Sequence, residues 1–395
     1  MKGEYSSNCG FCVPVMQPRN ERAQQLDVES DHLLILVHGI LASPSNWKYA
    51  EDELKSRLGN RFLIHASAVN SFLNTLDGID NAGRRLASEI EQIVEKVPSL
   101  KRISFVAHSL GGLFARYAVA MLYTPKDDFT EDMNILDELE SRGEEHPVFR
   151  RRREPKIAGL EAVNFIALAS PHLGVRGNKQ LPILLGVPVL EKLAAPIAPF
   201  VMGRTGKQLF LTDGKSSDSP LLLRMASDCP DGQFISALRA FKSRVVYANV
   251  RYDYVVGWRT SSIRRESELP RPPRVSMDGY KHVVNVEYCP AVASDAPAFQ
   301  QESAQGKAAA QVSPDSKKAA AYHNRLEEEM VRGLQRVSWR KVDVNFHSAV
   351  WPYLVAHDAL NVKIKWMHYE GAEVIAHVAD TLKQQEQTVF FEASL

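Results

Sequence analysis

The stretch Ile103-Ser104-Phe105-Val106-Ala107-His108-Ser109-Leu110-Gly111-Gly112 decides the fold of this 395-residue chain. Its first five residues predict a β-strand, and the apolar residues after Ser109 recur at helical spacing as far as Leu122. A serine on the sharp turn between a strand and a helix needs small neighbours two positions before and after it, because strand and helix crowd there. Ala107 and Gly111 fill those positions, although the strict motif has glycine at the first. The alternative is a serine that caps a helix, but this context favours a nucleophile.

Short β-rich apolar runs recur along the chain with helical patterns between them. The runs lie at 33–37, 62–64, 103–107, 163–168, 245–250 and 342–346. Between the second and third runs, residues 80–97 place apolar side chains at helical spacing. This alternation predicts an α/β fold with a mostly parallel central sheet and helices on both faces. Together with the serine turn, it predicts the α/β-hydrolase class.

We expect one enlarged domain over residues 31–395, preceded by a flexible N-terminal segment at 1–30. Three insertions interrupt the domain. Residues 124–156 are charged, and residues 293–321 are rich in Ala, Ser, Gln and Pro and are expected to be disordered. Residues 181–213 are apolar and broken by prolines, which fits either a lid over the active site or two helices packed on the core.

Charge and composition exclude several function classes. Lysine and arginine total 48 against 47 acidic residues, so no overall field attracts nucleic acid, and the basic run Arg150 to Arg153 belongs to a charge-balanced insertion. No apolar stretch approaches the length of a membrane span, so any membrane contact is expected to be peripheral. With no visible signal peptide and only four cysteines, the protein is expected to be intracellular and cytoplasmic. Cys9 and Cys12 have metal-ligand spacing but no second ligand pair, so no metal site is predicted.

The acid of a serine hydrolase of this class follows the nucleophile in the chain, and the histidine follows the acid. Asp253, directly after the run at 245–250, is the predicted acid. A turn aspartate that caps its own loop is the alternative. Asp228 and Asp231 precede that run and are weaker candidates.

The histidines after Asp253 are His282, His323, His347, His357, His368 and His377. His357 is the predicted base, because we place it in a loop beyond the final strand, from which it can reach back over the sheet edge toward Ser109. His347, at the end of that strand, is the second candidate. His377 lies in a helical pattern and is expected to be a packed or surface histidine.

A hydrolase also needs backbone donors for the oxyanion that develops during attack, each of which lowers the barrier by about 3–4 kcal/mol. The first strong strand ends at His38 and Gly39, where such a loop is expected. Ile40 or Leu41 on this loop and Leu110 after the nucleophile are the predicted donors. His38 is expected to brace the loop, with Gly39 beside it, rather than to act as the base.

These motifs resemble the DUF676 family of serine esterases, lipase-like α/β-hydrolases, especially the forms found in plants. The resemblance spans most of the chain and rests on Leu36-Val37-His38-Gly39, Ala107-His108-Ser109-Leu110-Gly111-Gly112, Ser170-Pro171-His172-Leu173-Gly174, Tyr247-Ala248-Asn249-Val250 leading into Asp253, and Asn345-Phe346-His347 with Ala356-His357-Asp358. It implies hydrolysis of a glycerolipid or related acyl ester without a metal or organic cofactor. It also supports His357 as the base and implies that His172 shapes a loop beside the site without carrying a proton.

Two other function classes stay open at this point. The same acyl-enzyme could transfer its acyl group to an alcohol, or the chain could be a lipid-binding or scaffold protein on a retired hydrolase fold, since fold alone does not establish activity. The complete set Ser109, Asp253 and His357 argues against a retired fold. The apolar insertion at 181–213 is what favours a lipid over another ester.

Overall fold

The computed structural model describes residues 30–126, 154–176, 202–214, 219–271, 276, 279–293, 317–349 and 352–393. Apart from Ser30, the expected N-terminal segment, with Cys9 and Cys12, lies outside these ranges. So do Arg150 to Arg153 and the larger part of each of the three expected insertions.

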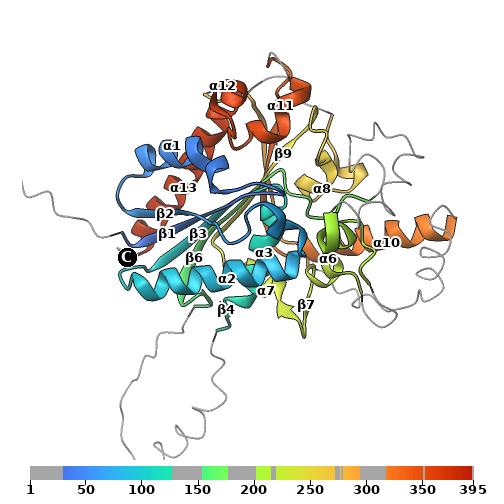
Figure 1. Cartoon of the computed structure of the whole chain (residues 1–395), viewed down its shortest axis with the longest axis horizontal. Coiled ribbons are helices and arrows are strands. Elements are labelled where there is room, and N and C mark those ends of the chain that lie inside the picture. Colours follow the sequence, from blue (N-terminus) through green and yellow to red (C-terminus); the bar gives the residue numbers. More distant parts are fainter. Residues whose placement is uncertain are drawn as a thin grey trace, which may run out of the picture.

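A central sheet carries six parallel strands in the order β2-β1-β3-β6-β9-β11, and an antiparallel strand, β10, pairs with β11 at one edge (Figure 1). The strands of this path are β1 (His32–Val37), β2 (Phe62–Ala66), β3 (Arg102–His108), β6 (Leu160–Leu168), β9 (Ser243–Asn249), β10 (Val283–Cys289) and β11 (Trp339–Val344). All six runs predicted from the sequence form strands, so the mostly parallel sheet is confirmed.

Helices cover both faces of the sheet (Figure 1). The α-helices are α1 (Lys48–Leu58), α2 (Ile79–Lys96), α3 (Gly111–Met121), α6 (Leu221–Arg224), α7 (Phe234–Arg239), α8 (Trp258–Ser262), α10 (Lys317–Leu334), α11 (Pro352–Ala359), α12 (Lys365–His368) and α13 (Ala372–Ala393). Short 3-10 helices are η1 (Pro44–Trp47), η2 (Phe72–Leu76), η4 (Glu266–Glu268) and η5 (Tyr369–Gly371). Within the described ranges, no helix is long and apolar enough to cross a membrane.

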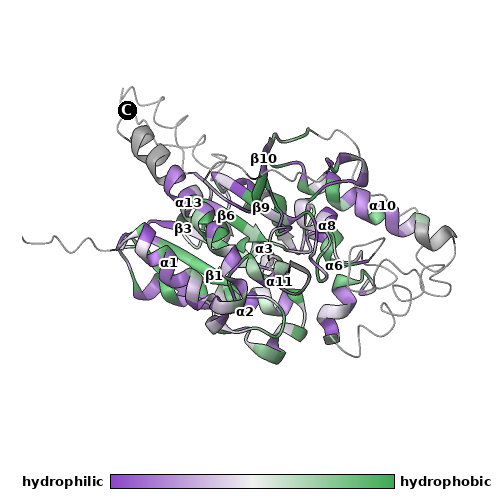
Figure 2. Ribbon diagram, turned by 90° about the horizontal axis from the view of Figure 1, so that it is seen from above, coloured by the Kyte–Doolittle hydropathy of each residue, from purple (hydrophilic) through white to green (hydrophobic). Residues whose placement is uncertain are grey.

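The strand β1 shows why these segments are unbroken apolar runs. Leu33 and Ile35 pack into a core with α2, α3, α7 and α10, whereas Leu34 and Leu36 pack into a second core with α1 and α13. Successive side chains of a strand point to opposite faces, so a strand covered on both faces is apolar at every position. Figure 2 shows the apolar strands enclosed by helices with polar outer sides.

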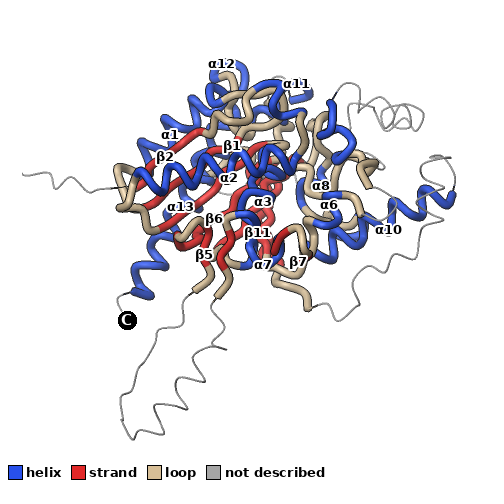
Figure 3. Tube along the Cα trace, turned by 60° about the horizontal axis from the view of Figure 1, so that its bottom comes forward, coloured by secondary structure: helices blue, strands red, loops and turns tan. Residues whose placement is uncertain are grey.

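The charged insertion leaves the domain through a small antiparallel ladder. Its first and last residues, Thr124 and Lys156, lie opposite each other in the pair β4 (Tyr123–Thr124) and β5 (Lys156–Ile157), and β5 pairs in turn with β6. Figure 3 shows β5 at the end of the molecule opposite α11 and α12. The insertion is therefore anchored away from α11 and α12. A second small pair joins β7 (Asp228–Cys229) to β8 (Gly232–Gln233).

The third expected insertion needs a correction at its end. Residues 317–321 were expected to be disordered with the rest of 293–321, but they open the helix α10. The apolar residues later in that helix are fully buried in the core: Leu326, Met330, Val331 and Leu334. This apolar face, which lies beyond residue 321, is what holds the helix on the domain.

Candidate active site

Ser109 stands on the turn between β3 and α3, as the elbow motif predicts. Its φ of 55° is in the left-handed region, which a non-glycine residue occupies only at a cost. The N–H of Ser109 donates to the carbonyl of Leu168 on the neighbouring strand β6 at 2.8 Å. A side chain at Gly111 would overlap the carbonyl oxygen of Val37, which explains the need for a small residue two positions after the serine.

The side chains of Ser109, His357 and Asp253 come from three different parts of the chain and are joined by hydrogen bonds. The ring of His357 places Nε2 at 2.9 Å from Oγ of Ser109 and Nδ1 at 2.9 Å from Oδ2 of Asp253. These are hydrogen-bonding distances, and the order of contacts is that of a serine, its base and the acid that orients the base. The sequence-predicted nucleophile, base and acid thus lie together.

Asp253 is held by more than the histidine. Its Oδ1 accepts the N–H groups of Val255 and Val256, each at 2.9 Å, and its Oδ2 also accepts Nδ2 of Asn249 at 2.9 Å. The carboxylate follows β9 directly, so the turn after the strand fixes its position. Sequence reasoning did not identify Asn249 as a residue that holds the Asp253 carboxylate, although Asn249 lies within the motif at 247–250.

The electrostatics of the pair favour an ionised acid and a strong base. Burial disfavours the charged form of His357, but the Asp253 carboxylate outweighs burial and raises the pKa of His357 above its ordinary value. Burial would also raise the pKa of Asp253, but the charge of His357 and the donors from Val256 and Asn249 hold that pKa below its ordinary value.

The surroundings of His357 differ from the expectation in one respect. We expected the base in a loop, but it lies in the last turn of the helix α11. The second candidate, His347, is exposed three residues beyond the end of β11, and its backbone N–H donates to Oδ1 of Asn345 at 3.1 Å. His377 lies in α13, as expected, where Nδ1 is 2.7 Å from the hydroxyl of Tyr247.

The loop after β1 runs beside the serine. A side chain at Gly39 would come within 2.8 Å of Cβ of Ser109, so only glycine allows this approach. Leu41 N–H donates to Oγ1 of Thr75 at 3.0 Å, whereas in the described part of the chain the N–H of Ile40 has no hydrogen-bond partner. His38 is buried with Nδ1 at 3.1 Å from the carbonyl of Gly39, and burial lowers its pKa.

A cavity of about 170 Å³ opens onto the serine. It is lined by His38, Gly39, Ile40, Ala42, Asn46, His108, Ser109, Val255, His357, Asp358, Asn361 and Lys363. The loop after β1 therefore forms one wall, and α11 with the turn after it forms another. No group of side chains in the described ranges has the composition of a metal site.

His172 does not reach this cavity. It is fully buried, its carbonyl accepts from the guanidinium of Arg116 at 3.2 Å, and its ring lies against Trp339. Burial and the charge of Arg116 keep the pKa of His172 well below its ordinary value. These contacts fit a residue that shapes the loop after β6, as the motif implies.

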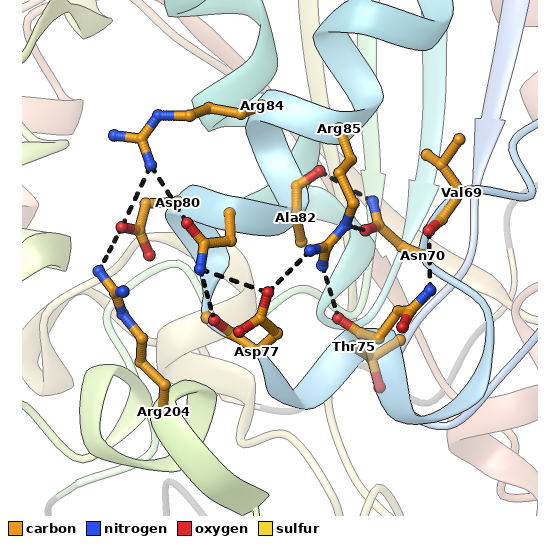
Figure 4. Close-up of polar contacts among 12 residues, drawn as sticks. Val69, Asn70, Thr75, Asp77, Asp80, Ala82, Arg84, Arg85 and Arg204 are labelled. Atoms are coloured by element: carbon orange, nitrogen blue, oxygen red, sulfur yellow. Dashed lines mark hydrogen bonds and ion pairs between the residues drawn. The ribbon is translucent and has the colours of Figure 1, made fainter.

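The described end of the apolar insertion, residues 202–213, packs on the domain next to the loop after β1. Residues 202–209 are helical, and Arg204 pairs with Asp80 at the start of α2 (Figure 4). Thr205 donates to the carbonyl of Thr75 at 2.7 Å, the residue whose hydroxyl accepts the N–H of Leu41. This part of the insertion therefore behaves as a packed helix, and the rest of 181–213 lies outside the described residues.

A parallel sheet with a serine turn after β3, an aspartate after β9 and a histidine after β11 is an α/β-hydrolase. A family model described as "Putative serine esterase (DUF676)" matches residues 27–263, more than half of the chain. The chain belongs to this family, as its motifs predicted.

Curated relatives are described as putative lipases. Putative lipase YDL109C of Saccharomyces cerevisiae is 30% identical over 241 residues, and putative lipase C4A8.10 of Schizosaccharomyces pombe is 27% identical over 248 residues. Each match covers 60% of this chain but only 30% and 27% of the respective relative. The matched region thus spans less than a third of either relative.

Among solved structures, the mature lipase BlEst2 of Bacillus licheniformis is 14% identical and gives a TM-score of 0.31 over 60% of this chain and 70% of that chain. Phospholipase PlaB of Legionella pneumophila, in complex with thio-NAD, is 15% identical with a TM-score of 0.29 over 56% and 38% of the two chains. The fold assignment rests on the sheet order and the serine turn rather than on these distant similarities.

Proposed function

We propose that this protein is a serine hydrolase that cleaves carboxylic esters, with lipid acyl esters as its substrates. The observation that carries the proposal is the row in which Ser109, His357 and Asp253 are joined by two contacts of 2.9 Å. A serine hydroxyl becomes a useful nucleophile only when a base takes its proton, and Nε2 of His357 is within reach of that proton.

The proposed reaction has two halves. Oγ of Ser109 attacks the ester carbonyl while its proton passes to Nε2 of His357, and the resulting tetrahedral intermediate expels the alcohol, which takes that proton. Water then attacks the acyl-enzyme, gives one proton to His357, and releases the carboxylic acid as the proton returns to Ser109. Asp253 keeps the imidazole oriented and stabilises its charged form throughout.

The oxyanion donors in this proposal are the N–H groups of Ile40 and Leu110. Leu41, the alternative to Ile40, already donates to Thr75 and would have to break that bond to serve. Ile40 lies on the wall of the cavity next to the serine, and Leu110 follows the nucleophile directly. Donors positioned in advance for the developing charge are the larger share of catalysis in many hydrolases.

Exposed apolar side chains beside the cavity support a lipid substrate. Leu41 lies on the oxyanion loop, and Phe72 is joined to that loop by its N–H, which donates to the carbonyl of Ala42 at 2.8 Å. Leu41, Phe72 and Leu73 are 54%, 62% and 73% exposed. Trp366, in α12 three residues after the cavity residue Lys363, is 80% exposed. Large exposed apolar side chains close to a site favour contact with an apolar ligand.

The test is hydrolysis of p-nitrophenyl esters with acyl chains of two to sixteen carbons, followed by analysis of the products. We expect wild-type protein to release the free acid, with longer chains preferred over acetate, and Ser109→Ala to be inactive. Adding an alcohol acceptor separates hydrolysis from acyl transfer, because a transferase would form the new ester in place of the acid. Folded wild-type protein that cleaves none of these esters would contradict the proposal.

A further inference from the structure

The helix α11 ends at the turn that carries the proposed base. The last carbonyl groups of a helix lack partners from the helix itself and find them elsewhere. Two are taken up by the chain that follows: the carbonyl of Ala359 accepts the N–H of Val362 at 3.1 Å, and that of Asp358 accepts the N–H of Lys363 at 3.2 Å. This local turn closes the helix but does not tie it to the rest of the site.

Side chains from the central sheet reach two further carbonyl groups of the same turn. Nδ2 of Asn249, at the end of β9, donates to the carbonyl of Ala356 at 3.0 Å. Nε2 of His108, at the end of β3, lies 2.9 Å from the carbonyl of His357. Asn249 is also bonded to the acid, and His108 immediately precedes the nucleophile. The turn that bears the base is therefore tied to both strands that carry its partners.

The chemistry of His108 suits this contact. A carbonyl oxygen only accepts, so Nε2 of His108 must carry the hydrogen. Burial, with the nearby charge of His357, lowers the pKa of His108 to about 4, so the ring is neutral at neutral pH. The two rings lie 4.7 Å apart between their centres. A neutral neighbour does not repel the imidazolium that His357 becomes during catalysis.

We propose that His108 and Asn249 are positioning residues that hold the last turn of α11 and thereby set the distance from His357 to Ser109 and Asp253. The proposal rests on the proposed function, since it assigns both residues a role through His357. If the turn is released, the contact between His357 and Asp253 lengthens. The carboxylate then raises the pKa of His357 less than in wild type. Because burial still lowers this pKa, the net result is a lower pKa.

The experiment compares two substitutions at His108 with a buried-histidine control. His108→Phe keeps a ring and removes the donor, and His108→Gln keeps an N–H donor without a titrating group. His377→Phe removes another buried histidine, in α13, remote from the cavity. The measurements are kcat and KM for a soluble p-nitrophenyl ester from pH 5 to 9, with thermal unfolding of each variant.

We expect kcat of His108→Phe to fall at least tenfold while KM stays within twofold of wild type. The low-pH limb of its pH profile, where activity falls as His357 becomes protonated, should move to lower pH. His108→Gln should stay within about threefold of wild type with the limb unmoved. His377→Phe should leave the limb in place even where it lowers the unfolding temperature. Asn249→Leu, which keeps the branching at Cγ and removes the donor, should behave as His108→Phe does.

Folded His108→Phe with wild-type kcat and an unmoved limb would overturn the proposal. So would equal losses in His108→Phe and His108→Gln, because the donor would then not matter. Either result requires an active wild-type protein, so it is distinct from failure of the proposed function, in which wild type itself cleaves no ester.

Discussion

Nδ1 of His357 lies 2.9 Å from Oδ2 of Asp253, and only 13% and 2% of the two side-chain surfaces are exposed. A charged pair in such a place is strongly coupled, because little water screens it. The sign of the effect is clear: the carboxylate raises the pKa of His357 above its ordinary value despite burial.

Asp253→Asn should therefore change both the rate and its pH dependence. His357 acts as a base only when neutral, so activity is lost as pH falls through its pKa. In wild type we expect the midpoint of this low-pH limb of the pH profile to lie above the ordinary pKa of histidine. Asparagine removes the charge and leaves burial, so the limb should move to lower pH while kcat falls by about 10³–10⁴-fold. A pH profile of kcat/KM measures both effects, and an unmoved limb would contradict the assignment of Asp253.

Gly39→Ala should damage the site without unfolding the domain. The added methyl would come within 2.8 Å of Cβ of Ser109, so the oxyanion loop must shift. Displacements of about 1 Å near reacting groups cost about 10²-fold in rate. We expect that loss in kcat. Ala107→Gly, which restores the strict motif, is the matched control, and it should keep activity while losing about 0.5–1 kcal/mol of stability.

Thr75→Val tests the link between the oxyanion loop and the helix at 202–209. It removes the hydroxyl that accepts the N–H of Leu41 in a partly buried contact, and a donor left unpaired costs up to about 1–3 kcal/mol. We expect a lower free energy of unfolding by that amount, measured with urea, together with a reduced kcat. Thr212→Val, at the far end of the same described segment, should change neither, and equal effects of the two substitutions would contradict a specific link.

Trp366→Ala and Phe72→Ser test whether the exposed apolar side chains serve lipid substrates. We expect each to reduce hydrolysis of long-chain esters in emulsion or micelles several-fold while acetate hydrolysis stays unchanged. Tyr288→Ala, at a 69% exposed site on the edge strand β10, is the control and should affect neither. Parallel losses on acetate and on long chains would show that these residues do not act through the acyl chain.

The strands and the serine turn were predictable because their signals are local. The predicted runs are mainly apolar, and Ser109 carries its small neighbours within two residues. Asp253 was predictable from the order of elements. The edge strand β10 was not predicted, since Asn285 and Glu287 interrupt its apolar run on a partly exposed strand.

The details that sequence reasoning missed are set by contacts between distant segments. The helix around His357 is eight residues long, and partners from positions 108 and 249 hold its last turn. The choice between Ile40 and Leu41 depends on Thr75, 34 residues away. His108 and Asn249 stood inside quoted motifs, but their roles follow from the carbonyl groups that they meet, which no local pattern encodes.

The most direct measurement is labelling with a fluorophosphonate, which forms a covalent bond only with an activated serine, followed by mass spectrometry of the peptides. We expect one adduct, on Ser109, that is absent in Ser109→Ala and forms at least 10²-fold more slowly in His357→Ala. Folded wild-type protein that leaves Ser109 unmodified at saturating reagent, or His357→Ala that labels at the wild-type rate, would contradict the account.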